Sequence, residues 1–539
     1  MLDIPLSVPL FLPFAAGLAG MFAPKVARWL VLAASAGVLL YFIAMLADFD
    51  SGGGLHYVTD ETWIEELGVH YALGVDGLNI FLVGLTALLW TAAVGWAAAR
   101  EWDRPQHFFF HLGLAETAVL GAFLAQDLAL FVVFFDLMLV PFYFLVGIWG
   151  EGDRVRATTK LVIYTLAGSL LMLAGAVALG VLSTPEGGAI SFLFSDLEQR
   201  TTEAGTQYWI FALFALAFLV KAPAFPLHGW MPDAYRATPI PVLVLLSAVL
   251  SKVGVYAFLK IVLPILPEAS HHFQEILIAI AVVSILYGSV LAFSQDEARL
   301  VVGYSSIAQL GFIVLGIFSL DQKGAQGALM QMVNHGLVAA ALFFIIAVLG
   351  ARAGGSESLE RMGGIALRAP VLAALFLVVS LATLAMPGTP NFVGEILILF
   401  GVLEQKLVWG VVASTGVVLA AVYMIRMFQR AMHNRAGPAV ESREIGRLGL
   451  GVLAPLTAII VALGVYPQLI LERTEPATEA KTAEARALAV PPPPAAAEGA
   501  VPQGRPFLPP GAEGLPPGAV PPQGQVPQGQ GPQGQVPVP

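Results

Sequence analysis

Long apolar runs recur along most of the sequence and are separated by short polar stretches. A helix needs about 20 apolar residues to cross roughly 30 Å of hydrocarbon. About fourteen such runs begin near residues 2, 26, 76, 107, 128, 158, 207, 240, 273, 298, 326, 368, 407 and 449. Because backbone polar groups in lipid must bond within their own segment, each run is expected to be helical. The pattern predicts an all-α polytopic membrane protein, and the N-terminal run is expected to be an uncleaved first helix.

The positive charges in the loops give an orientation for these spans. If the spans alternate, the loops on one side hold only Arg200, Lys323 and Lys406, whereas those on the other side hold the many remaining loop lysines and arginines. Lysine and arginine concentrate in cytoplasmic loops of membrane proteins. The sequence therefore predicts that both termini are extracytoplasmic, in a bacterial inner membrane.

Two of the apolar runs are interrupted by prolines, at FLVKAPAFPLHGW and at LATLAMPGTPNFVGEILILF. Each interrupted run is the fourth span of a five-span unit, one over about 107–264 and one over about 273–433. A unit with an odd number of spans inserts upside down the second time. Paired breaks in inverted repeats indicate the ion site of a transporter, because unwound backbone there faces a polar cavity.

The domain organisation follows from where the apolar runs stop. Residues 1–472 are predicted to form the transmembrane domain, with the stretch 47–75 and the loop 182–206 as its only sizeable soluble pieces. Residues 473–539 are rich in Ala, Pro and Gln, and we predict a disordered tail that is prone to polyproline II structure.

Composition narrows the possible functions. Hydrophobic residues make up 57% of the chain and charged residues 12%, as expected for a protein embedded in a lipid bilayer. The net charge of −10 comes largely from loops and tail and implies no nucleic-acid partner. The absence of cysteine excludes cysteine-ligated clusters. No metal-binding, P-loop or dinucleotide motif is present, so we expect no cofactor or metal site in this chain and place any redox chemistry in partner subunits.

Two ionisable residues mark the first broken span. Lys221 follows a long apolar run and precedes Pro223 and Pro226, so its side chain cannot easily reach the membrane surface. Because burial disfavours the charged form of lysine, Lys221 is a candidate proton relay; alternatively, it only satisfies carbonyls freed at the break. Asp136, in another apolar span, needs a cationic partner, and Lys221 is the natural candidate.

Three further charges lie in later spans. Lys252 is in the middle of its span and is either a proton carrier or half of a permanent ion pair. Lys260, close to the end of the same span, is expected to extend to the membrane surface. Glu395 follows the second break and is a candidate for proton exchange, unless it serves only as a fixed counter-charge for one lysine.

Glu116, His228 and His335 complete the set of intramembrane candidates. Glu116 is either a pathway residue or part of a hydrogen bond between helices. The two histidines could relay protons because imidazole titrates near neutrality, or could simply be satisfied by interhelical hydrogen bonds.

Five segments carry a resemblance to a known family. They are FFDLMLVPFYFLVGIWG, KAPAFPLHGWMPDAYRATPIPVLVLLSAVLSKVGVYAFLK, RLVVGYSSIAQLGF, NHGLVAAALFF and PGTPNFVGEILILFG. Over residues 70–435 the sequence resembles the antiporter-like subunit M of respiratory complex I, the bacterial NADH-quinone oxidoreductase. The resemblance implies a fourteen-helix fold with two inverted repeats and a proton-pumping role driven by quinone reduction in other subunits.

The resemblance also implies roles for individual residues. The lysine of the family's first broken helix corresponds to Lys221, its central lysine and histidine to Lys252 and His335, and its exit-side glutamate to Glu395. Two positions depart from the family pattern. Asp136 stands where the family has glutamate, which shortens the side chain by one methylene, and Gln309 stands where histidine is usual, so this position cannot titrate.

The resulting hypothesis is a proton-translocating subunit of an NADH:quinone oxidoreductase that itself carries no redox centre. NADH, FMN, iron–sulfur clusters and quinone are then expected in partner subunits, and L- and N-type antiporter-like subunits on either side. Glu395 favours subunit M, because the L, N and Na⁺/H⁺ antiporter subunits typically have lysine there. The alternatives are a subunit of an Mrp-type cation/proton antiporter, the membrane arm of a related hydrogenase or cofactor-oxidising complex, and a purely structural scaffold.

Overall fold

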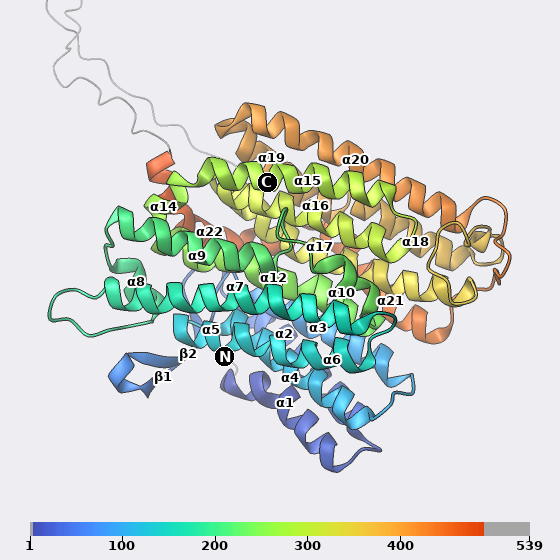
Figure 1. Cartoon of the computed structure of the whole chain (residues 1–539), viewed down its shortest axis with the longest axis horizontal. Helices are drawn as coiled ribbons and strands as arrows, with labels where there is room; N and C mark the ends of the chain where they lie inside the picture. The colour runs from blue at the N-terminus through green and yellow to red at the C-terminus, as the bar shows by residue number, and fades with distance from the viewer. Residues whose placement is uncertain (1–3, 490–539) are drawn as a thin grey trace, which may run out of the picture. The chain divides into compact units, whose positions relative to one another are not determined.

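The computed structural model describes residues 4–489, and these residues are mainly helical. The chain begins with two antiparallel helices, a two-stranded sheet and a third helix (Figure 1). These elements are α1 (Ser7–Phe22), α2 (Ala27–Asp48), β1 (His56–Ile64), a 3₁₀ turn (Glu65–Leu67), β2 (Val69–Val75) and α3 (Ile80–Ala98). The stretch 47–75, predicted only to be soluble, thus contains an antiparallel hairpin in which His56 pairs with Val75 and Ile64 with Val69.

The next part of the chain contains the first proline-interrupted span. Its elements are α4 (Pro105–Leu124), α5 (Leu128–Leu137), α6 (Leu139–Trp149), α7 (Arg154–Leu182), α8 (Phe194–Gln199), α9 (Ala204–Lys221), α10 (Met231–Ala237), α11 (Ile240–Leu245), α12 (Ser251–Ala257) and α13 (Leu263–Ile265). Two π-helical segments, Leu246–Leu250 and Phe258–Val262, join α11, α12 and α13 into one continuous rod. The side chains of Asp127 and Asp153 cap the N-termini of α5 and α7, by accepting from the N–H groups of Leu130 and Arg156.

The remaining part contains the second interrupted span and the C-terminal helices. Its elements are α14 (Pro267–His272), α15 (Gln274–Ser294), α16 (Ala298–Phe318), α17 (Gln322–Arg352), a 3₁₀ turn (Ile365–Arg368), α18 (Pro370–Thr383), α19 (Pro390–Gln405), α20 (Leu407–Met432), α21 (Arg447–Val465) and α22 (Gln468–Ala489).

Twelve helices within residues 4–489 are long and apolar enough to cross a membrane, and α1 and α18 are shorter apolar helices at two more of the expected positions. The predicted starts of all the spans therefore coincide with helices. The protein is a multi-span, mostly helical membrane protein, and its division into two inverted five-helix repeats stays a prediction.

The domain boundary predicted after residue 472 falls inside α22. Residues 473–489 continue this helix because Ile470, Thr474, Thr478 and Thr482 recur at helical spacing and are all buried. The composition of this segment suggested a tail, but one face of it packs against the bundle. Residues 490–539, the rest of the predicted tail, lie outside the described residues.

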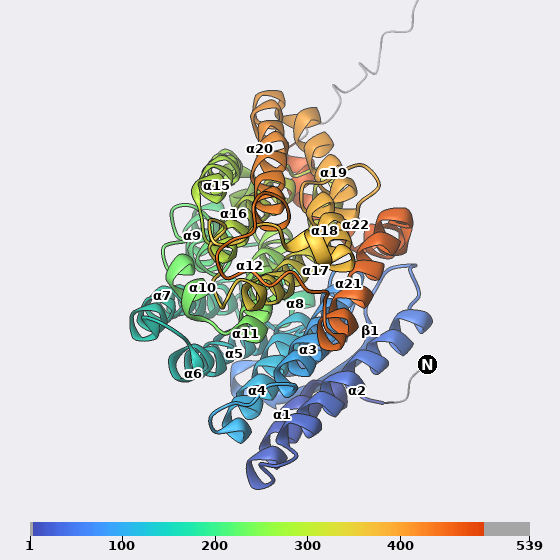
Figure 2. The ribbon, with the colours of Figure 1, turned by 90° about the vertical axis from the view of Figure 1, so that its right-hand side faces the viewer.

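The most deeply buried helices are the rod formed by α11–α13, together with α16 and α17. The most apolar stretch of the rod and that of α17 are 100% buried, against 33% for α2, α20 and α21. Viewed along the helices, α12, α16 and α17 lie in the middle, with α1 and α20 at the periphery (Figure 2). A charge on the central helices is therefore surrounded by protein rather than by lipid.

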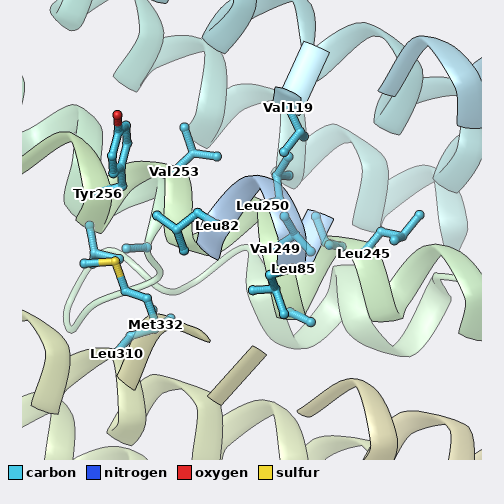
Figure 3. Packing of buried hydrophobic residues seen from close by; sticks show 14 of the residues in the cluster. Leu82, Leu85, Val119, Leu245, Val249, Leu250, Val253, Tyr256, Leu310 and Met332 are labelled. Carbon is cyan, nitrogen blue, oxygen red and sulfur yellow. The ribbon is translucent and has the colours of Figure 1, made fainter. Parts of the chain in front are cut away.

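Apolar side chains pack around the rod on several sides (Figure 3). Leu245, Val249, Leu250 and Val253 of the rod belong to one buried cluster with Leu82 and Leu85 of α3, Val119 of α4, Leu310 of α16 and Met332 of α17. Gly336 allows a close approach here, because a Cβ at this position would lie 2.9 Å from the carbonyl oxygen of Ala248. This close packing holds α17 against the first π-helical segment of the rod.

Candidate proton pathway

The first broken span places Lys221 at the last residue of α9. Residues 222–230 leave the helix, because Pro223 and Pro226 cannot donate backbone hydrogen bonds. The indole N–H of Trp230 donates to the carbonyl of Val220 at 3.0 Å, so this group is satisfied at the break. The side chain of Lys221 is only 5% exposed, and its Nζ lies 4.6 Å from the centre of the Phe135 ring.

Asp136 is a neighbour of Lys221 but does not form a direct ion pair with it within residues 4–489. Its carboxyl group interacts with Ser169 on α7 and, at longer range, with Lys221. One carboxylate oxygen, Oδ1, is buried and has no hydrogen-bond partner in the described part of the chain. Asp136 is one methylene shorter than the glutamate that the resemblance implies at this position, and here it interacts with Lys221 only at longer range.

The helix that follows the first break is attached to α7 by charged side chains. Lys160 of α7 donates to the carboxylate of Asp233 in α10, and Arg156 lies 3.9 Å from the same carboxylate. The hydrogen bond from Lys160 lowers the pKa of Asp233, and the two cations add to this effect. These contacts attach the short helix that follows the break to the adjacent long helix.

Replacing Asp233 with asparagine is expected to destabilise the protein at neutral pH but not in acid. Because the pKa is lower in the folded state, the ionised carboxylate stabilises the fold above its unfolded pKa of about 4, and this contribution is lost as the pH falls through the folded pKa. The thermal midpoints of the wild type and Asp233→Asn, measured from pH 7 downwards, should converge below about pH 4. A difference that persists unchanged in acid would contradict this assignment.

Lys252 lies in the middle of the central rod and is completely buried. Its ammonium group donates to the carbonyl of Ser247 at 2.9 Å and to the hydroxyl of Ser251 at 3.3 Å, and it has no acidic ion-pair partner within residues 4–489. The π-helical segment Leu246–Leu250 contains Ser247, and such segments occur frequently at functional sites. Isolated burial of a charge is unfavourable by several kcal/mol, so this position is not explained by stability.

Two serines lie between Lys252 and His335, and Lys252 contacts the first of them, Ser247, at its backbone carbonyl. Ser247 lies 3.5 Å from Ser306 of α16, measured between the two Oγ atoms, and Ser306 Oγ lies 3.2 Å from Nε2 of His335 on α17. All of these side chains are buried. The resulting chain, from Lys252 through Ser247 and Ser306 to His335, crosses from the first predicted repeat to the second.

Glu395 lies on α19, just after the second break, and two amides hold one of its oxygens. Oε1 accepts from Nε2 of Gln309 at 2.9 Å and from Nε2 of Gln331 at 3.4 Å, while Gln331 also donates to Oε1 of Gln309 at 2.6 Å. The other oxygen, Oε2, is buried and has no hydrogen-bond partner among residues 4–489. No cation within residues 4–489 pairs with this carboxyl group. The alternative that Glu395 is a fixed counter-charge for a lysine is therefore not supported by these residues.

Glycines at the interface of α17 and α19 make this contact possible. A Cβ at Gly394 would lie 2.5 Å from Gln331 Oε1, and one at Gly327 would lie 2.8 Å from the carbonyl oxygen of Gly394. Only residues without side chains fit here. The two helices therefore approach closely enough for Gln331 to reach Glu395.

The structure brings Lys252 near His335 through two serines and joins Gln309 directly to Glu395, with Asp136 and Lys221 at the first break. Glu116 belongs to a different place, where its Oε2 accepts from Ser35 of α2 at 2.5 Å. His228 packs against the rings of Phe225 and Tyr287 beside the first break. Neither residue joins the chain of hydrogen bonds that begins at Lys252.

The expectation that Lys260 extends to the membrane surface is wrong. Instead of extending to the membrane surface, its side chain is 3% exposed and donates to Asp76 Oδ2 at 2.7 Å. Asp76 Oδ1 meanwhile accepts from the backbone N–H groups of Leu78 and Asn79, before the start of α3. Burial of the partner carboxylate makes the ion pair more favourable than exposure of the lysine, and α22 covers this end of the bundle.

Replacing Lys260 with methionine is expected to destabilise the chain by about 3 kcal/mol, because it leaves the carboxylate of Asp76 buried without its partner. Removing both charges, with Lys260→Met and Asp76→Asn together, should restore most of the loss. Thermal unfolding of the purified protein in detergent measures both effects. Equal stability of the single variant and the wild type would rule out this role for the pair.

Sequence reasoning missed Ser247, Ser306 and Gln331. A signal was present for two of them, because Ser306 and Gln309 on α16, and Gln331 and His335 on α17, recur at helical spacing within otherwise apolar helices. Ser247 has no such signal. It meets Lys252 through its backbone carbonyl, in a π-helical segment that the sequence pattern does not reveal. Within residues 4–489, no group of three or more acidic or histidine side chains could hold a metal ion.

Two broken helices with buried charges, joined across a fully buried helical core, define an antiporter-like membrane protein. The family described as "NADH:quinone oxidoreductase/Mrp antiporter, TM" matches residues 125–420. The chain belongs to this family of antiporter-like membrane subunits.

Similar proteins come from several bacteria. NADH-quinone oxidoreductase subunit M of Rhodobacter capsulatus is 34% identical, over 87% of this chain and 95% of its own length. The subunit M of Escherichia coli K12 is 37% identical, over 78% of this chain and 84% of its own length. A chain of respiratory complex I from Thermus thermophilus with bound NADH matches with a TM-score of 0.82 and 29% identity, covering 89% of this chain and 99% of that one. An Mrp complex chain from Dietzia, at 20% identity and a TM-score of 0.78, shares the fold.

Proposed function

We propose that this chain is the M-type subunit of a bacterial NADH-quinone oxidoreductase and moves protons across the membrane. The observation that carries the proposal is the buried series from Lys252 through Ser247, Ser306 and His335, with Glu395 on the adjacent helix. Several uncompensated polar and ionisable groups in mid-membrane are unfavourable for stability, and proton relays are their common function. The subunit M relatives support the identity of the complex.

In the proposed mechanism, a proton from the cytoplasm reaches Lys252 and leaves past Glu395. In this proposal the paired hydroxyls of Ser247 and Ser306 take up the proton that leaves Lys252, and Ser306 gives a proton to Nε2 of His335 as it gains one. The imidazole then releases a proton from Nδ1 toward Glu395. After one transfer the imidazole carries its proton on Nε2, so the ring must turn or exchange that proton before it accepts another at the same nitrogen. The chain carries charge without a redox change of its own.

Lys221 and Asp136 act as the switch in this proposal. When Asp136 approaches the lysine, the charged form of Lys221 is stabilised, and when it turns toward Ser169 that stabilisation weakens. A charged Lys221 in turn repels a proton on Lys252. Gly254 supports this coupling, because a Cβ there would lie 3.2 Å from Cβ of Lys221, so α9 and α12 are in close contact.

The energy must arrive from partner subunits in this proposal. NADH, FMN, iron–sulfur clusters and quinone belong to those subunits, and L- and N-type antiporter-like subunits flank this chain in the membrane. The chain lies in the bacterial inner membrane with both termini extracytoplasmic, which makes the face of Lys160 and Asp233 cytoplasmic and the end covered by α22 extracytoplasmic.

Purification of the chain from its native membrane, with its associated subunits, tests this function. The complex should oxidise NADH with a quinone and acidify the lumen of vesicles in which NADH is supplied outside, in sodium-free buffer. A complex without NADH input, or one that only exchanges Na⁺ for H⁺ across the membrane, would overturn the proposal. The second result would identify an Mrp-type antiporter instead.

A further inference from the structure

The first turn of α19 contains a buried amide that the protein itself does not satisfy. Asn391 is 0% exposed, and neither its Nδ2 nor its Oδ1 has a hydrogen-bond partner within the described residues. Buried polar side chains almost always have a partner, and one left without any destabilises the fold. Asn391 therefore lowers stability where an apolar side chain of similar size would fit.

Asn391 lies one helical turn before Glu395 on the same face of α19. The adjacent face of α17 carries Asn334, which donates from Nδ2 to the carbonyl of Pro390 at 2.8 Å and so holds the start of α19 against α17. The residue after Pro390 is Asn391 itself. The unsatisfied amide is thus positioned at the second break, between the two helices that carry the end of the pathway.

Other polar atoms without a partner come from the same two helices. His335 Nδ1, Gln331 Oε1 and Asn334 Oδ1 on α17, and Glu395 Oε2 on α19, are all buried and unsatisfied. Both nitrogen and oxygen groups are included, so the set offers donors and acceptors together. Groups of this kind hold water inside proteins, because water satisfies several of them at once.

One of the two carboxyl oxygens of Glu395 cannot receive a proton from His335. Oε1 of Glu395 is already occupied by the amides of Gln309 and Gln331, and an amide cannot release and accept protons as an imidazole does. Oε2 is therefore the oxygen that can take a proton. The route to Oε2 must avoid Gln309, which stands where the resemblance predicted a histidine.

We propose that Asn391 is a positioning residue for the last internal proton transfer, and that it holds a water molecule between Nδ1 of His335 and Oε2 of Glu395. In this step the imidazole gives its Nδ1 proton to the water, and the water gives one of its own protons to Glu395. His335 loses one proton, Glu395 gains one, and the water is unchanged. The inference rests on the proposed function and adds the residue that directs its final step.

The test replaces Asn391 with leucine, which has a similar size and no polar group, in the assembled complex. Proton transport per NADH oxidised, or the rate of coupled NADH oxidation, should fall about tenfold. The thermal midpoint should stay the same or rise, since no hydrogen bond is lost. The solvent deuterium isotope effect on turnover should increase, because proton transfer becomes slower than the other steps. Asn391→Ser should recover part of the activity, because a hydroxyl can also hold water.

Thr383→Val is the matched control, because Thr383 lies at the other end of the same break and its hydroxyl bonds to the carbonyl of its own helix at Val379. It should pump as the wild type does. A wild-type complex that pumps, together with an Asn391→Leu complex that pumps equally, would overturn this inference and leave the proposed function intact. Loss of thermal stability in Asn391→Leu without a change in isotope effect would also overturn it, since that result indicates a structural amide. A wild-type complex that does not pump would refute the proposed function itself.

Discussion

A complex carrying Glu395→Gln is expected to lose nearly all proton pumping, with a decrease of about 100-fold in coupled turnover. Glutamine has the same size as glutamate, and its carbonyl can still accept from Gln309 and Gln331. What it cannot do is take up and release a proton at the second oxygen. The measurement is the acidification of vesicles during NADH oxidation, with the rate of oxidation followed in parallel.

Glu404 provides a matched control on the same helix. Its side chain is half exposed and pairs with Lys323 at 2.6 Å near the end of α19. Exposed ion pairs contribute little to stability, so Glu404→Gln should assemble and pump normally. If Glu395→Gln pumps as well as Glu404→Gln, Glu395 is not part of the proton route.

Lys252→Met is expected to abolish pumping while leaving the fold as stable as before, or more stable. Methionine matches the length of lysine but carries no proton. Removal of a buried charge without a counter-ion is expected to stabilise the chain by about 2 kcal/mol, in contrast to the loss expected for Lys260→Met, which breaks an ion pair. Pumping assays and thermal unfolding of the same preparation distinguish these two effects.

Lys406→Met serves as the control for this substitution. Lys406 forms an ion pair with Glu275 at 2.6 Å that is partly open to solvent. Its loss should change neither pumping nor stability by much. A Lys252→Met protein that is less stable than the wild type would mean that the lysine has a structural role through its bonds to Ser247 and Ser251.

The two lysines of the rod show how the same residue type takes different roles. Lys252 and Lys260 are both buried and lie on one continuous helix. Lys260 has a carboxylate within hydrogen-bonding distance, so its charge is fixed. Within residues 4–489 Lys252 bonds only to a carbonyl and a hydroxyl, which is the basis for proposing that its charge leaves as a proton. The groups around each lysine, rather than its depth in the bundle, distinguish the ion-paired lysine from the proposed proton carrier.

The sequence by itself determined the membrane spans, the two breaks and most of the ionisable residues. These features depend on properties that run along the chain. An apolar run of sufficient length must form a helix in lipid, and clustered prolines, as at 223 and 226 and at 387 and 390, disfavour a continuous helix. A charge within such a run is equally visible, which is why Lys221, Lys252 and Glu395 could be identified without a structure.

Only the tertiary structure decided which of these groups meet. The contact between Lys260 and Asp76 joins residues 184 positions apart, and that between Gln331 and Glu395 joins residues 64 positions apart. Both depend on which helix faces pack together, and for the second pair on two glycines that let α17 and α19 approach. The composition also gave a wrong prediction for residues 473–489. They form a helix, because one face of it is buried against the bundle. The proposed pathway depends on which side chains of different helices pack together. The pattern of apolar residues along the sequence does not show which helices are adjacent.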